Sequence, residues 1–351
     1  MPRMSDAFAG LACALVFICM GCQADEQVAK ADAPESADRA AQSASTNPAE
    51  VVDLPDQPVA GASQSFWDHW GDGRAEIATY TGTQMRYGEP REARLALIYV
   101  TEPHDRRTFV KDDAVAKQNR IQVMKLNRAL KFQTGVYPYT VMTSVFSPVA
   151  DWGRPRFQPA KITLTSQEWC GHVFHGLWAG PGQARQMMHS YFAGEGDDAS
   201  TLQLPDNVVY EDALPIQLRE LDGAFNDGER WEGPMVPSLW QRRRAHSEVD
   251  TVEATISREQ TTLDETPVTR FTVEMPDRST VYDVGREDPH HLLRIKHSGG
   301  TVFRLDEVDR MAYWRMNGRG DAEKRRRIGL PPGAFNLENP SSPESGSSTP
   351  R

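Results

Sequence analysis

Short segments in which apolar and polar residues alternate recur along most of this chain of 351 residues, and Gly, Pro and Asp separate them. Side chains of a β-strand point alternately to opposite faces, so a period of two predicts strands with one buried face. The clearest segments are Ala75–Tyr80, Ala93–Thr101, Ile121–Leu126, Tyr137–Phe146, Lys161–Phe174, Ala184–Phe192, Val249–Ser257, Val268–Met275, Thr280–Val284, Leu292–His297 and Thr301–Leu305.

Short turns between these segments favour antiparallel pairing, and Ser298-Gly299-Gly300 is a strong hairpin signal. The sequence therefore predicts a mainly β protein, with an antiparallel sheet that forms a half-barrel or a sandwich. Helix signals are few. We expect one short helix at about Glu211–Leu221, where Pro215 limits its length, and another at Glu307–Trp314 unless that stretch is a further strand.

The first 22 residues have the features of a bacterial lipoprotein signal peptide. Arg3 precedes an apolar run that ends at Gly21-Cys22, and this run is too short to span a bilayer. Residues 1–21 would be removed, and Cys22 would be diacylated, with palmitate-type chains, to become the lipid anchor. The pattern resembles the lipobox, with Cys19 where Leu is usual. The alternative is an ordinary signal peptide cut near Ala12 or Ala24.

Composition divides the rest of the chain into a body and two disordered ends. Residues 22–63 lack aromatic residues and are rich in Ala, Asp, Glu, Ser and Pro, so we expect a disordered tether. The tail at 331–351 is expected to be disordered as well. Residues 64–330 are expected to form a single β-rich domain, with a possible lobe boundary at 225–236, where Gly, Asp and Pro cluster.

Charge and targeting restrict the partners. The formal net charge is −10, which argues against a nucleic-acid partner. The expected membrane contact is the lipid on Cys22. Because Gln23 follows this cysteine in place of the aspartate that signals inner-membrane retention in some bacteria, we expect an outer-membrane lipoprotein that faces the periplasm or the cell surface.

Cys170 is the one cysteine outside the targeting segment, so it cannot form an internal disulfide, and we expect it to be buried and inert. If Ser166–His175 is one strand, Glu168, Cys170 and His172 stand in a row on one face, about 6.6 Å apart. These are the side chains of a Cys–His nucleophile with an orienting acid. Direct contact between a nucleophile and its base requires a distance of about 3 Å, so we assign no catalytic residue. A periplasmic hydrolase that uses these three residues is the alternative.

A zinc site formed by His172, His175 and His189 is a further alternative, if the strands that carry them pair. On a regular strand, however, His172 and His175 point to opposite faces. We therefore expect no metal and no cofactor. No Gly-x-Ser-x-Gly motif is present, which argues against a serine hydrolase.

Aromatic residues are candidates for a ligand-binding cleft, because their rings suit sites that are apolar inside and wet at the rim. Packing in the core is the alternative role. The candidates are Trp70, Tyr80, Tyr87, Trp169 and Trp314.

Several motifs resemble a group of bacterial envelope lipoproteins that often carry the label "septum formation inhibitor Maf". The motifs are GRAEIATYTGTQMRYGEPRE (73–92), VTE (100–102), VMKLNRALKFQTGVYPYTVMTS (123–144), QEWCG (167–171), HSYFAGEGD (189–197) and AYW (312–314). The resemblance covers nearly the whole body and implies an exported, lipid-anchored protein. True Maf proteins are cytoplasmic nucleotide pyrophosphatases of α/β architecture that begin with a strand and a Ser-x-Arg loop. This chain lacks that opening, so we expect neither nucleotide hydrolysis nor septum inhibition.

The leading hypothesis is thus a non-enzymatic, lipid-anchored envelope protein that binds an apolar ligand or an envelope partner. The alternatives are the hydrolase and a purely structural interaction module.

Overall fold

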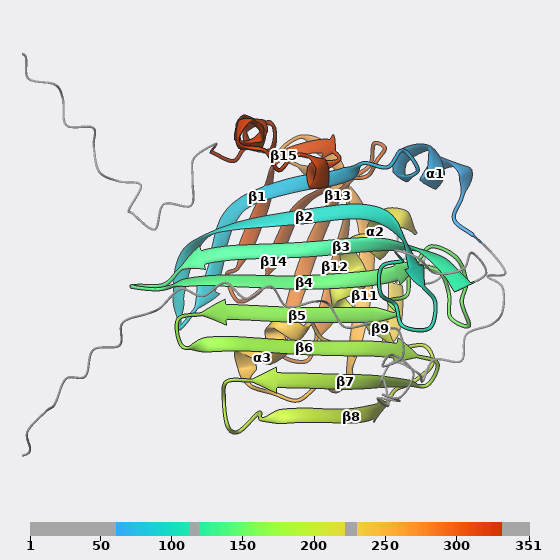
Figure 1. Cartoon of the computed structure of the whole chain (residues 1–351), viewed down its shortest axis with the longest axis vertical. Coiled ribbons are helices and arrows are strands. Elements are labelled where there is room, and N and C mark those ends of the chain that lie inside the picture. Colours follow the sequence, from blue (N-terminus) through green and yellow to red (C-terminus); the bar gives the residue numbers. More distant parts are fainter. Residues whose placement is uncertain (1–60, 113–118, 222–229, 332–351) are drawn as a thin grey trace, which may run out of the picture. The chain divides into compact units, whose positions relative to one another are not determined.

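The computed structural model describes residues 61–112, 119–221 and 230–331. The signal peptide, Cys22 and nearly all of the tether and tail lie outside these residues. Fifteen strands form one sheet in the order β8-β7-β6-β5-β4-β3-β2-β1-β15-β14-β13-β12-β11-β10-β9 (Figure 1). All neighbours pair antiparallel except β9 and β10, which pair parallel. The predicted mainly β, antiparallel architecture is confirmed.

The strands are β1 (Ala75–Arg86), β2 (Glu89–Asp105), β3 (Arg120–Gln133), β4 (Pro138–Pro148), β5 (Lys161–Glu168), β6 (Gly171–Gly180), β7 (Gln183–Ser190), β8 (Asp197–Gln203), β9 (Val209–Tyr210), β10 (Arg230–Val236), β11 (Val252–Leu263), β12 (Thr266–Met275), β13 (Arg278–Gly285), β14 (Leu292–His297) and β15 (Val302–Met311). The helical segments are α1 (Gln64–Trp70), η2 (Glu211–Ala213), α2 (Leu214–Glu220), α3 (Leu239–Ala245), η3 (Tyr313–Arg315) and η4 (Arg319–Ile328). None of the helices in this part of the chain is long and apolar enough to cross a membrane.

Two sequence predictions need correction, and the alternative left open at 307–314 is decided in favour of a strand. The segment Lys161–Phe174 is two strands, β5 and β6, joined by a turn at Trp169-Cys170. The stretch 307–314 continues strand β15 to Met311. Part of the expected loop at 225–236 is strand β10, which lies in the same sheet as the N-terminal strands.

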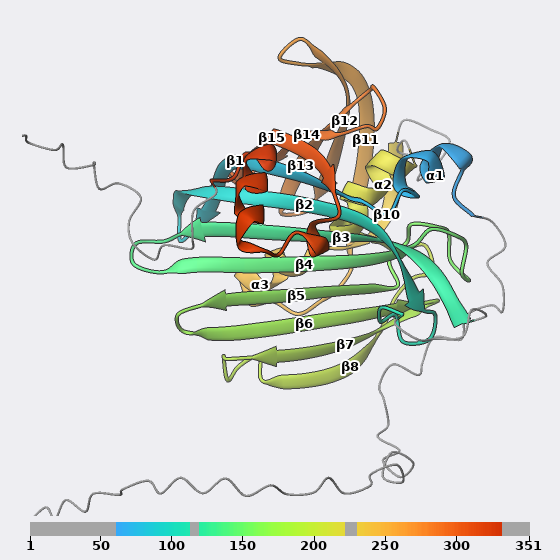
Figure 2. The ribbon, with the colours of Figure 1, turned by 45° about the horizontal axis from the view of Figure 1, so that its top comes forward.

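The sheet bends back on itself, so that β1–β8 lie in front of β9–β15, with α2 and α3 between the two halves (Figures 1 and 2). The alternation of side chains along each strand decides which residues point into the core. Tyr99, Leu126, Val145, Ile162 and Leu177 lie opposite one another on five adjacent strands and are all buried. These side chains, with others from α2, α3 and the rear strands, form one continuous core.

The change of direction occurs where β1 meets β15. The register between them shifts at Thr79/Tyr80, as a β-bulge that increases local twist. Gly82 follows, and a Cβ atom built at this position would lie 2.0 Å from the carbonyl oxygen of Val302. Only glycine permits this approach of the two backbones.

A buried ion pair joins the sheet to the helices. Glu76 of β1 is fully buried, and its Oε1 accepts a hydrogen bond from Nη1 of Arg219 in α2 at 2.7 Å. The Nε2 atoms of His69 and His291 lie 3.3 and 3.4 Å from its Oε2. Arg219 also donates to the carbonyl oxygen of Pro289 at 2.9 Å. Burial alone would raise the pKa of Glu76, but Arg219 and the two imidazoles hold it well below its usual range.

We expect Glu76→Gln to lower the free energy of unfolding by roughly 3–5 kcal/mol, because it leaves Arg219 buried without its counter-charge. Because the folded-state pKa of Glu76 is lowered, its contribution is complete above about pH 5 and is lost as the pH falls. The free energy of unfolding, measured by urea titration, should therefore fall more steeply for the wild type than for Glu76→Gln as the pH is lowered from about 5 to about 3. Glu76→Gln combined with Arg219→Met should cost less than the sum of the two single changes. Simple additivity would contradict a coupled pair.

Candidate functional site

Four hairpin turns project from one end of the sheet, at the left in Figure 1. They join β1 to β2, β3 to β4, β5 to β6 and β7 to β8. Because successive strands are antiparallel and lie in sequence order, every second turn must fall at the same end. Each turn is two strands from the next, so neighbouring turns are about 10 Å apart.

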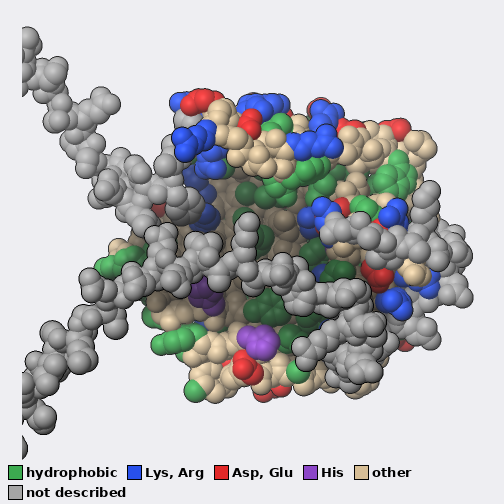
Figure 3. Space-filling view, viewed as in Figure 1, with side chains coloured by type: hydrophobic (Ala, Val, Ile, Leu, Met, Phe, Trp, Pro, Cys, Tyr) green, Lys and Arg blue, Asp and Glu red, His purple; other side chains and the backbone are tan. Residues whose placement is uncertain are grey.

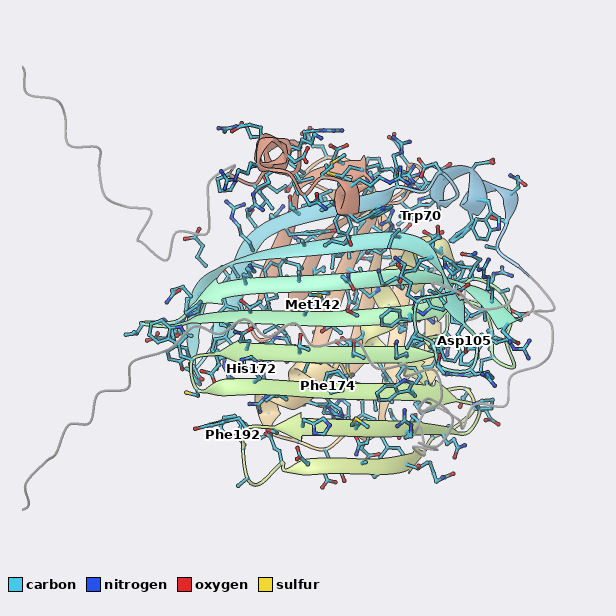
Figure 4. The ribbon with its side chains drawn as sticks, viewed as in Figure 1. Trp70, Asp105, Met142, His172, Phe174 and Phe192 are labelled. Carbon is cyan, nitrogen blue, oxygen red and sulfur yellow. The ribbon has the colours of Figure 1, made fainter. Side chains whose placement is uncertain are left out.

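Each of these turns exposes at least one large apolar or aromatic side chain. The exposed fractions range from 37 % to 74 %, which is high for such residues. We call this set the tip surface, and its members are Tyr87, Val136, Trp169, Tyr191 and Phe192. Figure 4 shows Phe192 at the end of the sheet opposite to Trp70 and Asp105.

Local backbone geometry presents these side chains. Tyr87 and Gly88 both have positive φ, at 56° and 77°, as a two-residue type I′ hairpin turn requires. Gly171 begins β6 directly under the Tyr191 ring, where a Cβ atom would lie 2.7 Å from ring carbon Cγ. Glycine at 171 thus lets the turn that carries Trp169 pack beside the turn that carries Tyr191.

A second layer of aromatic side chains supports the tip surface from below. The hydroxyl groups of Tyr87 and Tyr139 are 2.7 Å apart, and Arg86 lies over the Tyr87 ring at 4.2 Å. Tyr139 stacks on Phe132, with ring centroids 4.9 Å apart. Partial burial raises the pKa of Tyr87, but hydrogen bonds with Tyr137 and Tyr139 and the charge of Arg86 bring it below its usual value. The exposed ring of Tyr87 is therefore held in place.

Carboxylates at these turns have partners. Glu195 accepts a hydrogen bond from Nη1 of Arg243 at 2.9 Å, and Glu89 is paired with Arg91. Glu168 accepts a hydrogen bond from the backbone N–H of Cys170 at 2.7 Å. Burial raises the pKa of Glu195, but hydrogen bonds from Ser190 and His246 and the charge of Arg243 lower it overall. These ion pairs and hydrogen bonds reduce the free-energy cost of moving the carboxylates into a less polar environment.

Sequence reasoning found part of this surface. Tyr87 and Trp169 were candidate ligand contacts, and the structure places both at this end of the sheet, on the β1–β2 and β5–β6 turns. It missed Val136, Tyr191 and Phe192. The available signal for Val136 was its position next to Gly135 inside a turn, combined with the rule that alternate turns share one end of the sheet. Tyr191 and Phe192 had been included in the expected strand Ala184–Phe192, which ends at Ser190 in the structure.

The other aromatic candidates lie elsewhere. Trp70 and Tyr80 are buried, and the hydroxyl of Tyr80 donates to the carbonyl oxygen of Leu292 at 2.8 Å. Trp314 is exposed on η3, which follows the end of β15 that pairs with Ala75, at the opposite end from the tip surface. These three residues do not line a common cleft.

A polar cavity of about 540 Å³ lies at that opposite end. It is formed by α1, the β4–β5 connection, the end of α2 and the β13–β14 loop. Its lining includes the basic side chains Arg156, Arg219 and His290 and the acidic side chains Glu220 and Asp288, beside the rings of Phe66, Trp70 and Phe157. Opposite charges in one cavity do not fit an apolar ligand.

The expected row of Glu168, Cys170 and His172 is not formed. Cys170 lies in the turn between β5 and β6, and His172 lies two residues into β6. The expectation that Cys170 is buried is also wrong, because its thiol is exposed. A hydrogen bond to Glu168 raises the pKa of the thiol, whereas a nucleophilic cysteine needs a lowered one.

The three candidate zinc ligands are divided between the two faces of the sheet. His172 and His189 point to the outer face, where His189 lies 2.9 Å from Asp197. His175 is buried on the inner face, next to Gln186. Within the described ranges, no group of three or more His, Cys, Asp and Glu side chains is placed to hold a metal.

Comparisons with known proteins give only distant similarity to solved structures. No family model matches the chain, and no curated protein matches it. The chain is similar to the crystal structure of a β-barrel-like protein of domain of unknown function DUF1849 from Brucella abortus, with 9 % identity and a TM-score of 0.43. The match covers 68 % of this chain and 98 % of that chain.

We expect the Cys170 thiol to react with iodoacetamide in the folded protein without denaturant. Because the pKa of the thiol is raised by Glu168, the reaction should be slow at neutral pH and accelerate above about pH 9. Glu168→Gln should lower the thiol pKa and speed alkylation at a fixed pH, whereas Gln167→Glu, on the opposite face of β5, should not. Fast labelling of the wild type at neutral pH would instead support the hydrolase alternative.

Proposed function

We propose that this chain is a lipid-anchored protein of the bacterial cell envelope that acts by binding, and that its β body rests on a lipid surface through the tip surface. The row of exposed aromatic and apolar side chains on consecutive hairpin turns is the observation that carries this proposal. Exposed apolar groups of this kind on a soluble body mark interaction sites.

The chemistry of the tip surface favours lipid over a rigid protein partner. Tyr and Trp are enriched where membranes meet water, because an apolar ring carries a polar group at its edge. The four turns follow one another in a row at spacings of about 10 Å. Fluid lipid can adapt to such an extended row of side chains, whereas a folded partner would need a surface that matches its whole length.

The predicted anchor agrees with this arrangement. A coil-like tether of about 40 residues spans roughly 35 Å, since end-to-end distance grows as about 5–6 Å times the square root of length. The body can therefore reach the surface that holds the acyl chains. A single lipid signal gives weak attachment, and a second contact strengthens it.

Two other functions receive less support. An apolar ligand inside the folded sheet has little room, because core side chains and the helices α2 and α3 occupy the space between the two halves. Hydrolysis through Cys170 lacks an adjacent base, since His172 lies on strand β6 while the thiol is in the preceding turn.

Cys170 offers a direct test, because it is next to Trp169 on the tip surface. In the full chain with Cys13, Cys19 and Cys22 changed to Ser, which cannot be acylated and keeps Cys170 as its one thiol, a polarity-sensitive fluorophore on Cys170 should shift to shorter wavelength when phospholipid vesicles are added. The same fluorophore on Arg107→Cys in a Cys170→Ser background lies at the opposite end of the sheet and should not shift. Equal shifts at both positions, or none at Cys170, would contradict the proposal.

Removing the exposed side chains should weaken vesicle binding. The change of Val136, Trp169 and Tyr191 to Ser should lower affinity by roughly a hundredfold, since each buried side chain contributes about 1 kcal/mol. The matched control changes Val110 and Trp314, which are exposed at the other end of the sheet, to Ser. Co-sedimentation measures both variants. Similar losses in both would indicate nonspecific adhesion.

A further inference from the structure

The polar cavity at the end of the sheet opposite to the tip surface has the size of a small-molecule site. Its volume is about 540 Å³. Ligand pockets in proteins measure about 300–1,000 Å³. Figure 3 shows side chains of both charges on the right of this face, at the end where α1 lies in Figure 1. A body that rests on its tip surface leaves this end open to solvent.

Three aromatic rings line part of the cavity. Phe66 and Trp70 belong to α1, and Phe157 belongs to the connection between β4 and β5. The ring centroid of Phe66 lies 5.4 Å from that of Phe157 and 6.5 Å from that of Trp70. All three side chains pack in the main core, so they give the cavity a fixed apolar wall.

Most charged side chains of the lining already have partners. Arg219 pairs with Glu76 at 2.7 Å. His290 lies 3.0 Å from Asp288. The carboxylate of Asp68 accepts a hydrogen bond at 2.8 Å from a glutamine of the same helix. These groups are therefore less available to a ligand.

Arg156 is a cation of the lining without such a partner. Its backbone N–H donates to Oδ1 of Asp151 at 2.9 Å. Within the parts of the chain that the structure describes, no group accepts a hydrogen bond from its partly buried guanidinium. A guanidinium binds a carboxylate through two parallel hydrogen bonds. Arg156 can thus receive the carboxylate of a ligand.

Glu220 is an anion of the lining that lacks a counter-charge of its own. Its Oε1 accepts a hydrogen bond from Nε1 of Trp70 at 3.0 Å. The neighbouring cations, Arg219 and His69, both pair with Glu76. Burial raises the pKa of Glu220, and the charge of Arg219 and the hydrogen bond from Trp70 offset this only in part. An ammonium group in the cavity would supply the missing charge.

We propose that this cavity binds a small zwitterion of the peptide type, with its carboxylate on Arg156, its ammonium group on Glu220 and its apolar part against the aromatic rings. A ligand with one charge only would leave the other side chain unpaired in a partly buried site. The site is separate from the tip surface, so this inference goes beyond the proposed lipid contact and does not depend on it.

The test uses the full chain with Cys22→Ser and the dipeptide glycyl-phenylalanine, whose binding is measured by ligand-observed NMR titration. The N-acetyl derivative lacks the ammonium group, and the C-terminal amide lacks the carboxylate. Each derivative should bind roughly tenfold more weakly than the dipeptide, because one charged hydrogen bond is lost.

Two variants assign each charge to its side chain. Glu220→Gln should weaken binding of the dipeptide roughly tenfold but leave binding of the N-acetyl derivative unchanged. Arg156→Gln should weaken binding of the dipeptide but not that of the amide. Glu220→Gln keeps an oxygen that can accept the hydrogen bond from Trp70, so we expect the fold to be retained.

The matched controls, Glu253→Gln and Arg315→Gln, each remove one exposed charge outside the lining and should leave all affinities unchanged. Equal affinity of the dipeptide and its two derivatives, equal losses in the control variants, or no binding of the dipeptide at millimolar concentration would each overturn the inference. Vesicle binding through the tip surface is measured separately, and none of these outcomes affects it.

Discussion

The ion pair between Glu76 and Arg219 holds several elements together at one end of the sheet, and the strands extend away from that end. It joins the first strand to α2, with α1 and the β13–β14 loop attached through His69 and the carbonyl group of Pro289. Neither charge can leave the core alone without a large desolvation cost, so these four elements stay together. The long strands β1–β4 start or end at this anchored region, and their other ends form free hairpins. A rigid base with projecting turns follows from this arrangement.

Alternating hydrophobicity predicted the fold class because most strands have one face on the core and one in solvent. The prediction failed where that condition fails. Strand β8 lies at the edge of the sheet and is largely exposed, so its sequence DDASTLQ has no apolar face to detect. Strand β10 contains Gly233 and Pro234, which resemble a loop. The turn at Trp169-Cys170 contains no Asn, Asp or Pro, and only Gly171 marks the break between β5 and β6.

The candidate surface could be predicted only in part, because its members come together through topology. Tyr87 and Trp169 are aromatic and were recognised by residue type, but the same criterion selected Trp70 and Tyr80, which are buried. Residue type alone does not distinguish an aromatic side chain in the core from one on an exposed turn. Val136 and Tyr191 join the surface because the strands pair in sequence order, and strand order is set by long-range contacts.

Charged side chains on β8 hinder pairing of this edge of the sheet with other chains, whereas the hairpin turns of the tip surface expose apolar side chains. This contrast bears on function. Edge strands invite pairing with other chains, and exposed charge prevents it. Strand β8 begins with Asp197 and Asp198, both exposed, at this vulnerable position. On the neighbouring turns, polar residues would satisfy the same turn geometry, yet large apolar side chains occupy them. Since exposed apolar groups promote aggregation, their presence on consecutive turns is best explained by a contact that covers them. A lipid surface held close by the predicted acyl anchor is such a contact.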